Sequence, residues 1–140
     1  MPVDEAEFQV VDEWLKKAES DLTAAVYLLT LGDECPTEIV CYHVQQCVEK
    51  YLKAFLIHEG KPFPRTHDIS LLIDVIPAHK RPELLLDEQE LLTNYAIMTR
   101  YPGHSDEIQI SDAEHAVRIA RRVRKQVRAQ MPDLNFRRKK

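Results

Sequence analysis

Glycine is scarce in this sequence, and its scarcity excludes one broad class of fold. Only three glycines occur in 140 residues. Chains built from many β-hairpins need glycine at turn positions with positive φ, so a hairpin-rich protein is not expected. Leu, Ala, Glu, Lys and Arg are abundant instead, and these residues favour helices. The composition therefore predicts an all-α protein.

Cysteine is also rare. The three cysteines are an odd number, which argues against a disulfide framework. Cys41 and Cys47 fall within a helical pattern, so these thiols and Cys35 are predicted to be reduced and partly buried. His43 lies four residues before Cys47, but two ligands without a second pair nearby do not form a zinc site. Neither a metal nor a cofactor is expected.

Long apolar runs are missing too. Stretches such as Ala24 to Leu29 are far too short to span a bilayer. The acidic N-terminus lacks the basic start of a signal peptide. We therefore expect a cytoplasmic protein that does not interact with membranes.

The length predicts one domain, and the charge along it is uneven. We expect a single helical domain over residues 1–140, with a core from about 10 to 131 and a basic tail over 132–140. Residues 1–116 carry 22 acidic and 9 basic side chains, whereas residues 117–140 carry 10 basic and 1 acidic. The basic end could approach RNA phosphates or an acidic partner, or it could simply be a solvated helix face running into a frayed tail.

Apolar spacing, together with Pro and Gly as breakers, predicts four substantial helices and one short one. Ser111 and Glu114 have the form of a capping box at the start of the last helix. No strand pattern is convincing. The fold class is therefore all-α, an antiparallel four- to five-helix up-down bundle. The predicted helices cover residues 12–31, 37–59, 66–75, 82–99 and 111 onward.

The second predicted helix carries both a core stripe and a polar row. Its core stripe consists of Val40, Val44, Cys47, Val48, Tyr51 and Phe55. Beside this stripe runs a polar row, defined as His43, Gln46, Lys50 and Lys53. Lysines three residues apart can neutralise a phosphate, so the row is a candidate for binding. It could equally be a solvated flank of the helix, and Glu49 is placed to pair with Lys53 four residues later.

Four sequence motifs then point to a family. The segment 41–56, CYHVQQCVEKYLKAFL, looks like the hallmark second helix of HEPN domains, where a His-x-Gln-Gln-x-x-Glu-Lys-x-Leu-Lys-Ala pattern recurs. Trp14 with residues 18–22 (AESDL) resembles the opening helix of that family. Residues 66–69 (THDI) resemble the start of its third helix, and residues 95–102 (YAIMTRYP) the end of its fourth. The resemblance covers about residues 10–128.

The resemblance implies a homodimeric helical bundle with one of two kinds of activity. Many HEPN proteins work beside a minimal nucleotidyltransferase in two-component modules, including toxin–antitoxin pairs. Others are metal-independent RNases, in which an Arg and a His separated by four to six residues line a cleft between two protomers. The counterparts here are Arg100 and His104, but only three residues separate them, and Pro102-Gly103 forces a turn between them.

The two activities need different residues. In the RNase, His104 would remove the proton from a ribose 2′-OH and Arg100 would hold the phosphate. Because the Arg-to-His interval is short, we interpret the chain as a non-catalytic partner of a nucleotidyltransferase, and the metal-independent RNase toxin is the alternative. A simple dimerisation or adaptor module is a third reading. The residues predicted to bind nucleotide or RNA are His43, Gln46, Lys50, Lys53 and Tyr101.

Overall fold

The computed structural model describes residues 5–98 and 107–134, and these residues form helices without any strand. Two single turns of 3₁₀-helix, Gly32–Glu34 and Ala78–Lys80, lie in the connections. The prediction of an all-α fold is confirmed. The five α-helices are α1 (Glu5–Leu29), α2 (Thr37–His58), α3 (Ile69–Val75), α4 (Leu86–Met98) and α5 (Ile110–Ala129).

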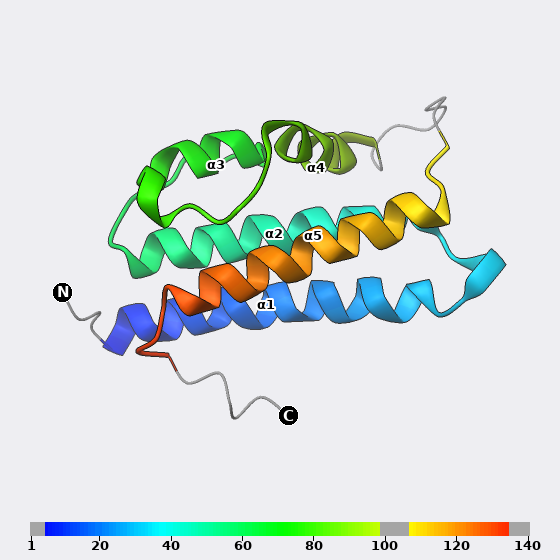
Figure 1. Cartoon of the computed structure of the whole chain (residues 1–140). Helices are drawn as coiled ribbons and strands as arrows, with labels where there is room; N and C mark the ends of the chain where they lie inside the picture. Colours follow the sequence, from blue (N-terminus) through cyan, green and yellow to red (C-terminus); the bar gives the residue numbers. More distant parts are fainter. Residues whose placement is uncertain (1–4, 99–106, 135–140) are drawn as a thin grey trace.

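Helix α2 occupies the centre of the bundle. It packs against each of the other four helices, most extensively against α1 and α5. Figure 1 shows α1, α2 and α5 as three long helices side by side, while α3 and α4 lie on the side of α2 that is away from α1. The short α3 runs in the same direction as α2, because His67 just before it lies beside Gln45 in the first half of α2 and Lys80 after it pairs with Glu59 at the end of α2. The four longer helices, α1, α2, α4 and α5, alternate in direction. This is the up-down connectivity that the sequence predicts.

The core stripe of α2 explains its central position. All six residues predicted to form the stripe are fully buried. Burial continues around the helix and includes three polar residues, Gln45, Glu49 and Lys53. A helix buried on nearly every side must satisfy such polar groups internally, because an unpaired buried polar group is costly.

Three predicted helix starts are wrong by three or more residues, and one of them is the start of α3, which lies at Ile69 rather than Thr66. Helix α1 begins at Glu5 rather than near Asp12, and the fully buried Val11 shows that the earlier turns take part in the packing. Helix α4 begins at Leu86 rather than Pro82, so Leu85 lies outside the helix and is exposed. The Glu88 side chain accepts a hydrogen bond from the Leu85 amide at 2.9 Å, which satisfies a free donor at the new helix start.

The cap predicted for α5 is also wrong, whereas α3 begins with a regular N-cap. Helix α5 begins one residue earlier than expected, and the Asp112 carboxylate, not Glu114, accepts the capping bond, from the Gln109 amide at 2.9 Å. Thr37 fixes this start because its hydroxyl donates to the carbonyl of the buried Ile108 at 2.7 Å. At α3, Asp68 accepts from the Ser70 amide at 2.9 Å, as an N-cap should.

No helix within residues 5–98 and 107–134 is long and apolar enough to cross a membrane.

Replacing Asp112 tests the observed cap of α5. We expect Asp112→Ala to lower the free energy of unfolding by about 1 kcal/mol, because it leaves the Gln109 amide without its acceptor. Glu114→Ala is the matched control, and as an exposed helix substitution it should change stability by no more than about 0.5 kcal/mol. Urea unfolding followed by circular dichroism measures both. A larger loss with Glu114→Ala would mean that Ser111 and Glu114 form the cap after all.

Candidate functional site

The polar row of α2 faces α1 rather than open solvent. Asp21 of α1 binds two of its members, accepting from Lys50 Nζ at 2.5 Å and contacting His43 Nδ1 at 2.9 Å. The side chains of Lys50 and His43 keep exposures of 20% and 28%. One carboxylate therefore lies between the cation and the imidazole that the sequence assigns to binding.

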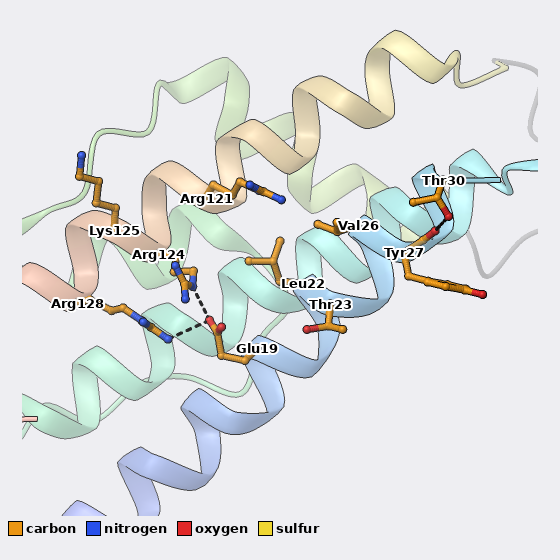
Figure 2. A pocket seen from close by; sticks show the side chains of 10 residues that line it. All are labelled: Glu19, Leu22, Thr23, Val26, Tyr27, Thr30, Arg121, Arg124, Lys125 and Arg128. Atoms are coloured by element: carbon orange, nitrogen blue, oxygen red, sulfur yellow. Dashed lines mark hydrogen bonds and ion pairs between the residues drawn. The ribbon is translucent and has the colours of Figure 1, made fainter. Parts of the chain in front are cut away.

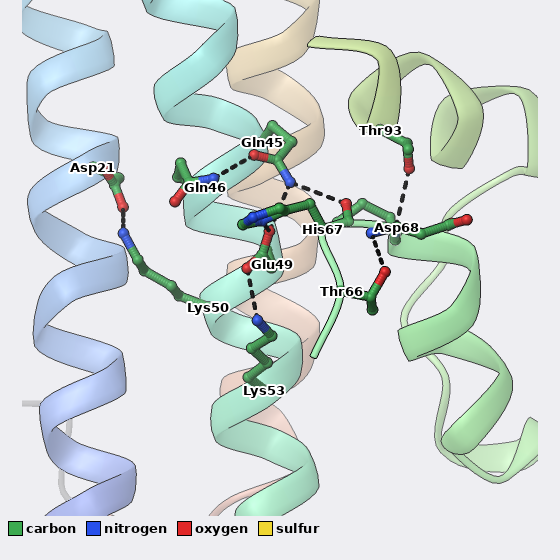
Figure 3. A network of polar contacts seen from close by, with 11 residues as sticks. Asp21, Gln45, Gln46, Glu49, Lys50, Lys53, Thr66, His67, Asp68 and Thr93 are labelled. Carbon is green, nitrogen blue, oxygen red and sulfur yellow. Dashed lines mark hydrogen bonds and ion pairs between the residues drawn. The ribbon is translucent and has the colours of Figure 1, made fainter. Parts of the chain in front are cut away.

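A second network surrounds Glu49, deeper on α2 (Figure 3). Its carboxylate accepts from Lys53 Nζ at 2.8 Å and from the Gln45 amide at 2.9 Å, and it lies 2.9 Å from His67 Nδ1. Gln46 extends this network by donating to the Gln45 side-chain oxygen at 2.7 Å. The Glu49–Lys53 pair predicted from sequence spacing is confirmed. His67 contacts the Glu49 carboxylate, and its neighbour Asp68 is the residue that caps α3.

The Lys53 ammonium is also enclosed by aromatic rings. Its Nζ lies 5.6 Å from the ring centroid of Trp14 and 5.5 Å from that of Phe63, within the range of cation–π attraction. The two rings meet edge to face with centroids 6.2 Å apart. Only 9% of the Lys53 side chain is exposed. A phosphate could reach this ammonium only after the rings and Glu49 had moved.

The Glu49 carboxyl has an altered acidity because of these partners. Burial by itself would raise its pKa, but hydrogen bonds from Lys53, His67 and Gln45 outweigh burial and hold the pKa of Glu49 below its usual range. The carboxylate is therefore the charged partner of a buried ion pair at neutral pH. Such a group holds its neighbours in place, and it is a poor general base.

A third cluster joins α1, α2 and α5. Glu19 of α1 accepts from Arg124 Nε at 2.7 Å, pairs with Arg128 at 3.3 Å and also accepts from the Tyr51 hydroxyl. Burial would raise the pKa of Glu19, yet the bonds from Arg124 and Tyr51 and the charge of Arg128 hold it below its usual range. Burial and the contact with Glu19 raise the pKa of the Tyr51 hydroxyl. The hydroxyl therefore stays protonated and donates.

Glu19, Arg124 and Arg128 of this cluster line a groove between α1 and α5 (Figure 2). The groove has a volume of about 820 Å³. Leu22 and Val26 of α1 form an apolar part of its surface, and Arg121 and Lys125 of α5 lie along its edge. Sequence analysis registered the basic character of α5 but not this groove, because its two walls come from opposite ends of the chain.

The predicted site residues are therefore separated by the fold. His43 and Lys50 share Asp21, whereas Gln46 and Lys53 belong to the Glu49 network. Their role in binding stays a prediction. The remaining predicted residues, Arg100, Tyr101 and His104, lie outside the described residues.

The residues that sequence analysis missed are the acidic partners on α1. Asp21 and Glu19 both lie in the segment that resembles the family's opening helix, yet their cations follow 29 and 105 positions later in the chain. No periodic signal connects residues so far apart. Gln45 was missed as well, although its place in the family-like segment 41–56 could have suggested a buried polar partner for Glu49.

Neither a metal centre nor a reactive thiol is indicated in the part of the chain described. No group of three or more His, Cys, Asp or Glu residues there could hold a metal ion. The three cysteines are free, with Cys41 and Cys47 buried and Cys35 partly so, as the sequence predicts. Burial raises the pKa of the Cys47 thiol, which makes it a poor nucleophile.

Known proteins share this fold and this arrangement of helices. The crystal structure of TT1696 from Thermus thermophilus matches with a TM-score of 0.70 at 26% identity, covering 85% of this chain and 96% of that one. ST0689, an archaeal HEPN homologue of known crystal structure, matches with a TM-score of 0.66 at 31% identity, covering 86% of this chain and 96% of that one. Both matches run through nearly the whole of the solved chains.

A family model for the HEPN domain matches residues 11–130. This chain belongs to the HEPN domain family. A relative from Methanocaldococcus jannaschii, named "Putative toxin MJ1304", is 35% identical over 96 residues. The match covers 64% of this chain and spans 61% of the length of that relative.

Neutralising Glu49 tests the buried network. We expect Glu49→Gln to lower the free energy of unfolding at pH 7 by about 3 kcal/mol, because it leaves the Lys53 ammonium buried without its anion. The double variant Glu49→Gln/Lys53→Met, which removes both charges, should recover part of that loss.

The single variant Glu49→Gln should also change how the free energy of unfolding depends on pH. The pKa of Glu49 is lower in the folded protein than in the unfolded chain, so its contribution is complete above the unfolded value of about 4.3 and disappears as pH falls through the folded value. Urea unfolding between pH 7 and pH 3 should therefore show a shallower decline for Glu49→Gln than for the wild type. An equal slope in both proteins would show that Glu49 does not control acid stability.

Proposed function

We propose that this HEPN protein acts as the non-catalytic helical partner of a minimal nucleotidyltransferase, and that it does so as a homodimer. The non-catalytic part rests on the short interval between Arg100 and His104, in which only Tyr101, Pro102 and Gly103 stand.

The polar row of α2 offers no replacement for a general base. The imidazole and both ammonium groups of the polar row are held by carboxylates, His43 and Lys50 by Asp21 and Lys53 by Glu49. Groups held in this way stabilise a scaffold, whereas a general base must be able to reach a substrate proton.

Family membership supports the proposal of a transferase partner. Members of this family commonly work beside a separate small nucleotidyltransferase, and the HEPN model covers most of this chain. The toxin name of the Methanocaldococcus relative is consistent with a two-component module, in which one protein restrains the other. The match spans only part of that relative, so its activity is a proposal for this chain.

The proposal includes nucleotide binding along α2, but with fewer residues than the sequence predicts. His43, Gln46 and Lys50 are partly exposed, and a phosphate could share His43 and Lys50 with Asp21. Lys53 is enclosed by two rings and its own carboxylate, so we assign it to the scaffold rather than to the ligand. Gln46 and Tyr101 remain candidate contacts.

Co-purification tests the partnership directly. We expect this protein, co-expressed with a minimal nucleotidyltransferase from the same genome, to elute with it as one peak in size-exclusion chromatography at micromolar concentration. The HEPN protein by itself should elute at the size of a dimer. A monomer that separates cleanly from the transferase would contradict both parts of the proposal.

The alternative function is a metal-independent RNase toxin, and the toxin name of the relative favours it. If it is correct, the protein cleaves RNA in the presence of EDTA, and His104→Ala abolishes cleavage because the general base is lost. His115→Ala is the matched control, since His115 is an exposed histidine of α5. The leading proposal expects no cleavage by any of the three proteins. Cleavage that is unaffected by His104→Ala would remove that residue from the mechanism.

A further inference from the structure

The groove between α1 and α5 combines an apolar surface with free positive charge. Leu22 and Val26 line it from α1, Leu22 with only 8% of its surface exposed and Val26 partly exposed. Tyr27 lies at one end with two-thirds of its surface exposed. Arg121 and Lys125 approach from α5, and neither has an ion-pair partner within residues 5–98 and 107–134. Exposed apolar surface edged by unpaired charge is typical of an interaction site.

Two arginines of the groove already bind a carboxylate of the protein itself. Arg124 and Arg128 already hold the Glu19 carboxylate, at 2.7 and 3.3 Å. Arg121 and Lys125 stand three residues before and one residue after Arg124 on the same helix. Glu19 satisfies only the inner pair of cations, so the outer pair is left to face an anion from outside.

We infer that this groove binds an amphipathic, acidic α-helix of a partner protein. The apolar face of such a helix would cover Val26 and Tyr27, and its acidic flank would pair with Arg121 and Lys125. Laid between α1 and α5, it would add a further helix to the bundle. This helix is defined by its apolar face and its carboxylates, and it need not belong to a nucleotidyltransferase.

The charge pattern favours an acidic helix over a nucleic acid. The cations that line the groove run from Arg121 to Arg128, which is about 10 Å along a helix. A nucleic acid that extends beyond these cations would be repelled by the rest of the protein, since residues 1–116 carry 22 acidic and 9 basic side chains. A short helix with one apolar face and a few carboxylates ends before it reaches that acidic surface.

A designed peptide tests the inference with the full-length protein. The probe is a fluorescein-labelled helical peptide with leucines at i, i+3, i+4 and i+7 and glutamates beside them, and binding is followed by fluorescence anisotropy. We expect binding in the micromolar range, and at least about tenfold weaker binding by the variant Arg121→Glu/Lys125→Glu. The variant should fold, because neither side chain has an internal partner, and circular dichroism checks this.

Two comparisons make the result specific. The variant Lys17→Glu/Arg118→Glu changes net charge equally at exposed positions outside the groove, and it should weaken binding by less than about twofold. Thr23→Glu introduces a negative charge from the α1 wall, so it should also weaken binding.

Three outcomes would overturn the inference. The first is no peptide binding up to about 1 mM. The second is equal weakening by both double variants, which would reduce the effect to net charge. The third is equal binding of a peptide with the same composition but scrambled order, or of a single-stranded RNA oligonucleotide in its place. Equal binding of the RNA oligonucleotide would assign the groove to nucleic acid instead.

Discussion

The buried Glu49 carboxylate is the group on which the arrangement around α2 depends. It joins Lys53 and Gln45 of its own helix to His67, which stands just before α3. An anion in this position stabilises the structure only while its partners remain, because a buried charge without a partner costs several kcal/mol. The network therefore ties the segment before α3 to the central helix. Gln46 is held in place as well, because it donates a hydrogen bond to the Gln45 side chain.

The second constraint is the cluster around Glu19, which joins α1 to α5. Its arginine partners belong to the basic end of the chain, while the rest of the chain is acidic. Part of the charge asymmetry is thus used internally, to hold the last helix on the first. The remaining cations, Arg121 and Lys125, are what give the groove its capacity to attract an acidic partner. Stability and recognition therefore draw on the same helix.

Sequence reasoning succeeded where the signal is local. The stripe of α2 follows the 3.6-residue period and was predicted residue by residue, and the Glu49–Lys53 pair follows from a spacing of four. It failed at helix ends. The Ser111–Glu114 box was a good local pattern, but Thr37 of a distant helix binds the carbonyl of Ile108 and shifts the start of α5.

The sequence by itself determined the helical class, the central helix and membership of the HEPN family, because each depends on composition, periodicity or an ordered set of motifs. Only the tertiary structure decided which charges are free. Asp21 and Lys50 lie 29 positions apart, and Glu19 and Arg124 lie 105 apart, so their pairing depends on how the helices pack. A cation that looks available in a helical row becomes part of the scaffold once a carboxylate from another helix is placed against it.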